Sequence, residues 1–257
     1  MATVAERPAR RMSADDRFFL ISAILMCAVV YGGFSFQLAM GRSSFAVPPL
    51  VHAHAIVFMG WVTIYLLQAA LATVGPMRWH RLLGWFAAAW MVPMIVLGPW
   101  LTAERVQAGR TPFFFEPQYF LIANPVGVLT FAGLTIAAIV LRRRSDWHRR
   151  LHMCGMAALL GPGFGRLLPM PFMIPVAFQA AVIAGLIFPA AGIVYDLRKR
   201  GRVHPAWWWG VGAIVATLFL AEVIARSPVG DAIYRAVTAG TPGADVAPMA
   251  FGKPPWA

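Results

Sequence analysis

Seven runs of about 20 apolar residues constrain this chain more than any other feature. A helix that crosses the hydrocarbon core of a bilayer needs roughly 20 such residues. Hydrophobic residues make up 60% of the 257 positions and charged residues only 12%, which is more apolar surface than one soluble domain of this length can bury. The sequence therefore predicts an all-α polytopic transmembrane bundle of seven helices, because helices satisfy their backbone polar groups internally. The runs lie near 18–40, 50–74, 81–103, 119–141, 148–168, 174–196 and 206–226.

The basic residues predict how the chain is oriented. Most of the 22 Lys and Arg residues fall in the N-terminal tail and in the loops before the third, fifth and seventh runs, which all lie on one side of the membrane if there are seven spans. The positive-inside rule assigns that side to the cytoplasm. We therefore expect a cytoplasmic tail (1–17), a seven-helix domain (18–226) and an extracytoplasmic C-terminal tail (227–257). We expect that last tail to be loosely ordered apart from a short helix at 231–237.

The net charge of +12 does not predict a nucleic-acid partner. The basic residues flank helices in short loops, where they set topology and attract anionic lipid. The first apolar run has no clear small-residue cleavage site and is longer than the apolar part of a signal peptide, so we expect it to be retained. The expected location is the plasma (inner) membrane of a bacterium, with the lipid bilayer as the partner.

Three histidines lie at the cytoplasmic starts of two expected helices. The stretches "RWHRLLG" (78–84) and "DWHRRLHMCG" (146–155) place His80 and His148 at similar depth, and His152 one turn further along the face of His148. A b-type haem needs two axial imidazoles from different helices, and the H-x-x-x-H pair with His80 could hold a transition metal. We therefore predict His80, His148 and His152 as cofactor-binding residues and metal ligands. The alternative is that His80 and His148 anchor helices at the lipid headgroups.

A second polar layer is expected in the outer part of the membrane, to which six helices contribute one residue each. Polar and ionisable side chains at this depth line a bundle interior or a cavity, because exposing them to lipid is costly. Arg166 and Glu222 carry charges of opposite sign, so Arg166 could meet either Glu222 or a ligand on the outer side. We predict this layer as a ligand site, with buried structural contacts as the alternative. Its members are Gln37, His54, Asn124, Arg166, Gln179 and Glu222.

Two local patterns refine these predictions. His54 shares a helix face with Trp61, Tyr65 and Gln68, so this stripe should face the bundle interior. The motif "GPGFG" (161–165) interrupts the fifth run, and because proline lacks a backbone N–H and clashes with the preceding turn, a break or kink is expected there.

The motifs around the histidines resemble those of a broad set of bacterial multispanning membrane proteins of unknown function. "HRLLG" and "DWHRRLHMCGMAALLGPGFGR" match the H-R-x-L-G and D-x-H-[RK]-R-L patterns of that set, over roughly the second to fifth helices. The resemblance implies no activity, but it marks His54, His80, His148 and Arg166 as positions of interest. The chain is more remotely similar to transmembrane b-type cytochromes, whose paired histidines on both membrane faces it does not reproduce.

The sequence supports two functional hypotheses. We prefer a membrane redox or electron-transfer protein that binds haem b or a transition metal at the three inner histidines. The alternative is a transporter or sensor of a small anionic ligand that uses the outer Arg/Glu/His layer. Whether the protein is an enzyme stays open. A retinal Schiff base is excluded because it requires an intramembrane lysine, and Lys199 and Lys253 both lie outside the expected spans.

Overall fold

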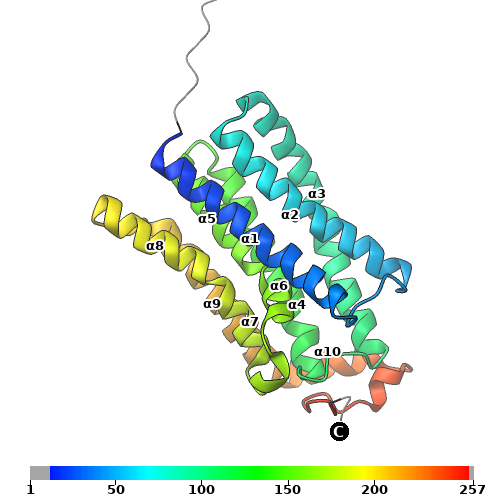
Figure 1. The fold of residues 1–257 in the computed structure, drawn as a ribbon. Coiled ribbons are helices and arrows are strands. Elements are labelled where there is room, and N and C mark those ends of the chain that lie inside the picture. The colour runs from blue at the N-terminus through cyan, green and yellow to red at the C-terminus, as the bar shows by residue number, and fades with distance from the viewer. Residues whose placement is uncertain (1–11, 255–257) are drawn as a thin grey trace, which may run out of the picture.

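A computed structural model describes residues 12–254, and within this range every regular element is a helix or a 3-10 turn (Figure 1). Most of the expected N-terminal tail, residues 1–11, and the last three residues lie outside the described residues. The α-helices are α1 (Ala14–Ala39), α2 (Pro49–Thr73), α3 (Met77–Gln107), α4 (Pro117–Val140), α5 (Ser145–Ala158), α6 (Gly161–Leu167), α7 (Ala177–Gly185), α8 (Ile187–Arg200), α9 (Pro205–Ala225) and α10 (Pro228–Thr238), and the 3-10 turns are η1 (Met170–Met173) and η2 (Pro242–Asp245).

The helix starts follow local capping rules. Ser13 and Asp16 form a capping box at the start of α1, in which each side chain accepts a hydrogen bond from the other's backbone N–H. Pro49, Pro117 and Pro205 are the first residues of α2, α4 and α9, where a missing N–H costs nothing because that group has no intrahelical partner. Short-range sequence signals therefore place most boundaries within a few residues of the expected ones.

Six helical segments are long and apolar enough to cross a membrane: α1, α2, α3, α4, the α7–α8 pair and α9. These segments show the all-α class and agree with an integral membrane protein. The expected count of seven is not confirmed, because the fifth apolar run is divided between α5 and α6, neither of which is long enough to span alone.

The division of the fifth run has a clear backbone cause. In a continuous helix, the N–H of residue 162 would bond the carbonyl of Ala158, but Pro162 has no N–H and its ring clashes with that carbonyl. α5 accordingly ends at Ala158 and α6 begins at Gly161. The predicted break is confirmed.

The long helices form a bundle with two distinct ends. α4 packs between α3, α5 and α9, and α1 packs against α2 and α6. We call the end that carries residues 12–17, 74–81, 141–150 and 198–204 the basic end, and the opposite end, across which α10 lies in Figure 1, the α10 end.

The C-terminal segment forms α10 and η2 and is hydrogen-bonded to the rest of the chain as far as Gly252, where a loosely ordered tail was expected. The short helix expected at 231–237 lies within α10. Buried Gln118 at the start of α4 donates hydrogen bonds to the Ala225 carbonyl and to Asp231, and the Tyr234 hydroxyl donates to the Gly243 carbonyl. These bonds tie α10 and the segment after it to α4 and α9.

Candidate functional site

The three inner histidines come together near the basic end, as predicted. The ring centroids of His80 on α3 and His148 on α5 are 6.3 Å apart, and those of His148 and His152 are 4.6 Å apart. The rings meet edge to face in both pairs. Two helices that are distant in the sequence therefore contribute to one imidazole cluster.

Backbone carbonyls orient two of these rings. The His80 Nδ1 lies 3.2 Å from the Gln68 carbonyl oxygen, and the His148 Nδ1 lies 2.8 Å from that of Ala138. A carbonyl oxygen can only accept, so Nδ1 carries the proton in both rings and a neutral ring keeps its lone pair on Nε2. Imidazoles that bind metals are commonly held by such a bond from the other nitrogen.

The imidazole cluster was expected to hold a haem or a transition metal. Within residues 12–254, however, no three His, Cys, Asp or Glu side chains are arranged to hold one metal ion. The three-histidine metal site gains no support, and the haem site stays a prediction.

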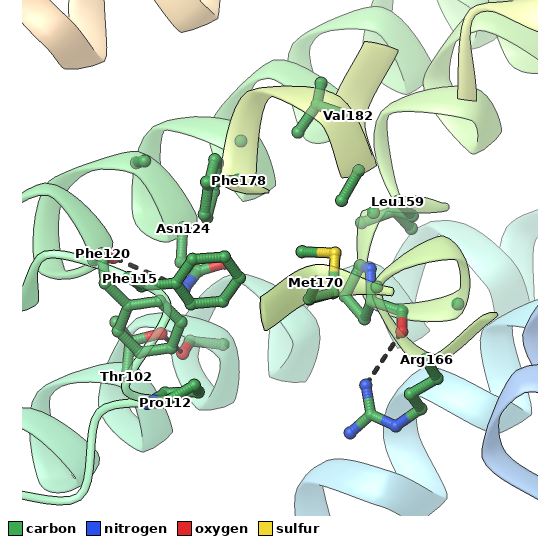
Figure 2. A pocket seen from close by; sticks show the side chains of 18 of the residues that line it. Thr102, Pro112, Phe115, Phe120, Asn124, Leu159, Arg166, Met170, Phe178 and Val182 are labelled. Atoms are coloured by element: carbon green, nitrogen blue, oxygen red, sulfur yellow. Dashed lines mark hydrogen bonds between the residues drawn. The ribbon is translucent and has the colours of Figure 1, made fainter. Parts of the chain in front are cut away.

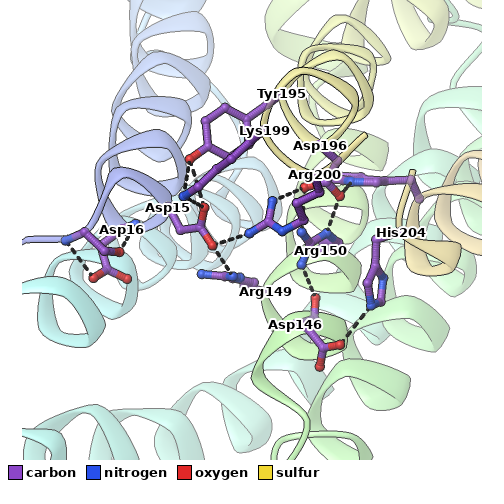
Figure 3. Close-up of polar contacts among 12 residues, drawn as sticks. Asp15, Asp16, Asp146, Arg149, Arg150, Tyr195, Asp196, Lys199, Arg200 and His204 are labelled. Atoms are coloured by element: carbon purple, nitrogen blue, oxygen red, sulfur yellow. Dashed lines mark hydrogen bonds and ion pairs between the residues drawn. The ribbon is translucent and has the colours of Figure 1, made fainter. Parts of the chain in front are cut away.

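A buried ion pair beside this cluster was not predicted from the sequence (Figure 3). The Arg150 guanidinium donates two hydrogen bonds to Asp196, at 2.9 and 2.7 Å, and both side chains are only 1% exposed. The Trp207 indole N–H also donates to Asp196, at 2.8 Å. This bidentate pair joins α5, α8 and α9, and its groups satisfy one another.

Asp15 forms a second hub of charge at the basic end. Its carboxylate accepts hydrogen bonds from Arg149, Lys199, Arg200 and the Tyr195 hydroxyl, as Figure 3 shows. The pairs connect the first turn of α1 to α5 and α8. The negative charge also lies near the positive end of the α1 helix dipole.

Asp146 and His204 form a third polar contact at the basic end. The His204 Nε2 lies 2.9 Å from the Asp146 carboxylate. Burial opposes ionisation of Asp146, but the hydrogen bond from His204 and the backbone N–H of Trp147 together hold the pKa of this carboxyl below its usual value. Each described carboxylate in these three pairings therefore has a basic partner.

A large cavity opens at the α10 end, with a volume of about 940 Å³. Its walls come from α1, α2, α3, α4, α6, α7 and α9 and from the aromatic loop at 112–115. Figure 2 shows Phe115, Phe120 and Asn124 on one side and Met170 and Arg166 on the other. The bundle thus encloses a site of the size that small-molecule ligands occupy.

Close packing of α1 on α6 positions Arg166. Gly33 faces Gly163 so closely that a Cβ on Gly33 would lie 2.6 Å from the Gly163 carbonyl oxygen, which lets the two backbones approach. Gln37, one turn after Gly33, donates a 2.7 Å hydrogen bond to the Arg166 carbonyl. The Arg166 guanidinium lies 3.6 Å from the centroid of the Phe34 ring and donates to the Pro162 carbonyl.

The predicted outer layer divides into two groups. Gln37, His54, Asn124 and Arg166 line the cavity, as the depth argument anticipated. Gln179 and Glu222 are not among its lining residues. Of the two partners considered for Arg166, Glu222 is not in contact with it among the described residues: Glu222 pairs with Arg226, which directly follows α9.

Glu222 belongs to a small cluster of charges at the rim of the bundle. Arg226 pairs with Glu222 and also with Glu116, at 3.2 Å. Burial raises the pKa of Glu116 above its usual value, Arg226 opposes this shift, and the charge of Glu222 raises the pKa further. Arg226 thus supplies a nearby positive charge to both acidic groups.

The charged side chains that line the cavity are all basic among the described residues. Its lining includes four arginines, and none of its lining residues among positions 12–254 is acidic. Arg42 and Arg110 are exposed near its mouth, and Arg105 lies next to Glu104 at 3.9 Å. Among the described residues Arg166 has no ion pair with a carboxylate, and its guanidinium contacts the Pro162 carbonyl and the Phe34 ring. The arrangement favours an anionic ligand, because guanidinium groups bind carboxylate and phosphate strongly.

The predicted stripe on α2 faces inward as expected. Trp61 is buried in the core, whereas His52 is exposed. The Nδ1 of His54, the indole nitrogen of Trp61 and the Oε1 of Gln68 are buried without a hydrogen-bond partner. Such atoms are uncommon in native proteins, and the stripe runs between the cavity and the histidine cluster.

No protein-family model, curated protein or solved structure matches this chain.

Proposed function

We propose that the protein is a multispanning membrane protein whose α10-end cavity binds a small anionic ligand, as a transporter or a sensor. The observation that carries this proposal is the 940 Å³ cavity lined by four arginines and by no acidic residue among those described. Placing a guanidinium in apolar surroundings without a carboxylate partner costs free energy, because the charge loses its hydration. An anionic ligand at Arg166 would offset that cost.

The test compares a carboxylate with its neutral analogue. Benzoate should raise the thermal transition of the purified protein, whereas benzamide should not. Arg166→Gln should remove the benzoate effect, and the control Arg235→Gln, which lies at the same end outside the large cavity, should keep it. Equal effects of benzoate and benzamide on the wild type would reject an anion site. If benzoate binds selectively, its uptake into proteoliposomes would indicate a transporter, and binding without uptake would indicate a sensor.

A redox function is the second proposal, and the orientation of His80 and His148 by backbone carbonyls favours it. His80 and His148 would hold a haem b between α3 and α5, and a bound haem would supply one-electron transfer. The ultraviolet-visible spectrum of the purified protein, oxidised and dithionite-reduced, should then show a Soret band and sharp reduced bands. Alanine variants of His80 and His148 should lose them, while His204→Ala should not. Full haem content in all variants would reject the assignment.

We also propose seven crossings, with α5 and α6 together forming the fifth. The basic end would then be cytoplasmic and the α10 end extracytoplasmic, in the inner membrane of a bacterium, as expected for the resembling bacterial membrane proteins. The distribution of arginine and lysine supports this orientation. Accessibility of single cysteines placed at residues 143 and 240 to an impermeant thiol reagent, in a background without Cys27 and Cys154, tests it: residue 240 should react from outside and residue 143 should not.

A further inference from the structure

The walls of the cavity are too apolar for a small inorganic or short-chain anion alone. Aromatic and aliphatic side chains cover most of its surface, and polar side chains are few. Its volume of about 940 Å³ lies near the upper end of the range for small-molecule sites. The apolar part of the wall includes Phe34, Phe58, Phe115, Phe120, Met170 and Phe178.

The cavity is also long. On α4 its lining runs from Phe120 to Thr130, a rise of about 15 Å at 1.5 Å per residue. The hydroxyls of Thr130 and Thr217 are hydrogen-bonded to each other at the deep end, so that end offers little free polarity. An extended apolar chain would match this shape.

The charge lies at the opposite end of the cavity. Arg42 and Arg110 follow α1 and α3 in the loops of the α10 end, and Arg166 lies near the end of α6. A ligand bound here therefore meets cations at the mouth and hydrocarbon in the depth.

We propose that the cavity holds an amphipathic anion, with one carboxylate or phosphate head at Arg166 and an unbranched apolar chain extending along α4 towards Thr130. This inference rests on the proposed anion-binding function and specifies its ligand class. The head contributes charge-assisted hydrogen bonds to the guanidinium, and the chain gains by leaving water for an apolar wall.

Binding of radiolabelled dodecanoate to the purified protein in phosphatidylcholine nanodiscs tests the proposal, with free concentrations fixed by equilibrium dialysis. Acetate, octanoate, dodecanol and dodecyl phosphate serve as competitors. Each buried methylene contributes about 0.8 kcal/mol, or about fourfold in affinity, so dodecanoate should bind at least tenfold more tightly than octanoate. Dodecanol should compete at least tenfold more weakly than dodecanoate.

Two glycines on α4 provide a matched pair of variants. Gly127 lines the cavity and Gly133 does not, and an added Cβ at either position meets no atom within 4 Å. Gly127→Leu should fill the apolar part and weaken dodecanoate binding at least tenfold, while Gly133→Leu on the exposed face should leave it unchanged. Arg166→Gln should erase the preference for dodecanoate over dodecanol, and Arg235→Gln should preserve it.

The outcomes separate this inference from the function on which it rests. If acetate and dodecanoate bind equally well and Arg166→Gln weakens both, the anion site stands and the amphipathic ligand is rejected. If dodecanol binds as tightly as dodecanoate to the wild type, both proposals fail. If Gly127→Leu and Gly133→Leu behave alike, the chain does not occupy this cavity. Tighter binding of dodecyl phosphate than of dodecanoate supports the proposal and identifies the head as a phosphate.

Discussion

The two ends of the bundle differ in whether their buried or cavity-lining charges have a partner of opposite sign. At the basic end, Asp15, Asp146 and Asp196 each contact a basic side chain, and the Arg150–Asp196 pair is buried. At the α10 end, Arg226 also pairs with Glu116 and Glu222, but Arg166 lines a cavity without any carboxylate among the described lining residues. A charge that has a partner within the protein holds helices together, whereas a charge without one is available to a ligand. The difference indicates structure at one end and recognition at the other.

The largest expected effect comes from breaking the buried pair at the basic end. Asp196→Ala should lower the free energy of unfolding by about 3–5 kcal/mol, because it leaves the Arg150 guanidinium buried and unpaired. The double variant Arg150→Met with Asp196→Leu should recover much of this loss. Chemical denaturation in detergent measures both. A single variant as stable as the wild type would show that the pair does not hold the bundle together.

Removing the unpaired charge at the α10 end should leave the stability nearly unchanged and weaken ligand binding. Arg166→Gln should change the free energy of unfolding by less than about 1 kcal/mol, because no carboxylate loses a partner. Affinity for dodecanoate should nevertheless fall about tenfold or more. The same denaturation assay, run beside the binding assay, gives both values. A loss of stability as large as that of Asp196→Ala would make Arg166 a structural residue and remove the contrast between the two ends.

A smaller effect is expected at Asp15, whose partners are partly exposed. Asp15→Asn should cost about 1 kcal/mol at low salt, and less in 1 M salt, where charges on the surface are screened. Thermal transitions of the wild type and the variant at both salt concentrations provide the measurement. A cost that does not depend on salt would mean that hydrogen bonding, and not charge, dominates this hub.

The smallest effect concerns the pH dependence of the Asp146–His204 contact. The pKa of Asp146 is lower in the fold than its usual value of 3.8, so its contribution to stability is complete above that value and is lost as the pH falls through the lower, folded pKa. The difference in thermal transition between the wild type and Asp146→Asn should therefore shrink below about pH 4. A difference that stays constant down to pH 2.5 would contradict this pairing.

Some residues of the cavity could be predicted from their depth in the membrane alone. Gln37, His54, Asn124 and Arg166 were predicted to lie in one layer, and all four line the cavity. Depth follows from counting residues along helices of known rise. It does not specify the direction in which a side chain points around its helix, and for this reason it could not decide whether Arg166 meets Glu222. The local partner Arg226, at the i+4 position, was the better choice for Glu222.

The Arg150–Asp196 pair could not be predicted from the sequence, because it depends on how the helices pack. Arg150 lies in a basic stretch and Asp196 at the end of an apolar run, and no local pattern connects them. A carboxylate so close to an apolar run was the available signal, because such a group needs a partner. Which of several arginines would meet it depended on the contacts between α5 and α8.

The sequence by itself determined the apolar helices, their starts at prolines and capping residues, and the break before Pro162. Each of these depends on interactions within a few residues, which the order of amino acids specifies directly. Only the tertiary structure decided which polar groups meet. The pairing of Arg150 with Asp196 buries two opposite charges at the basic end, and the close approach of α1 and α6 at Gly33 and Gly163 leaves Arg166 facing a cavity at the α10 end. Contacts between residues on different helices have no local signature, since they result from the packing of whole helices.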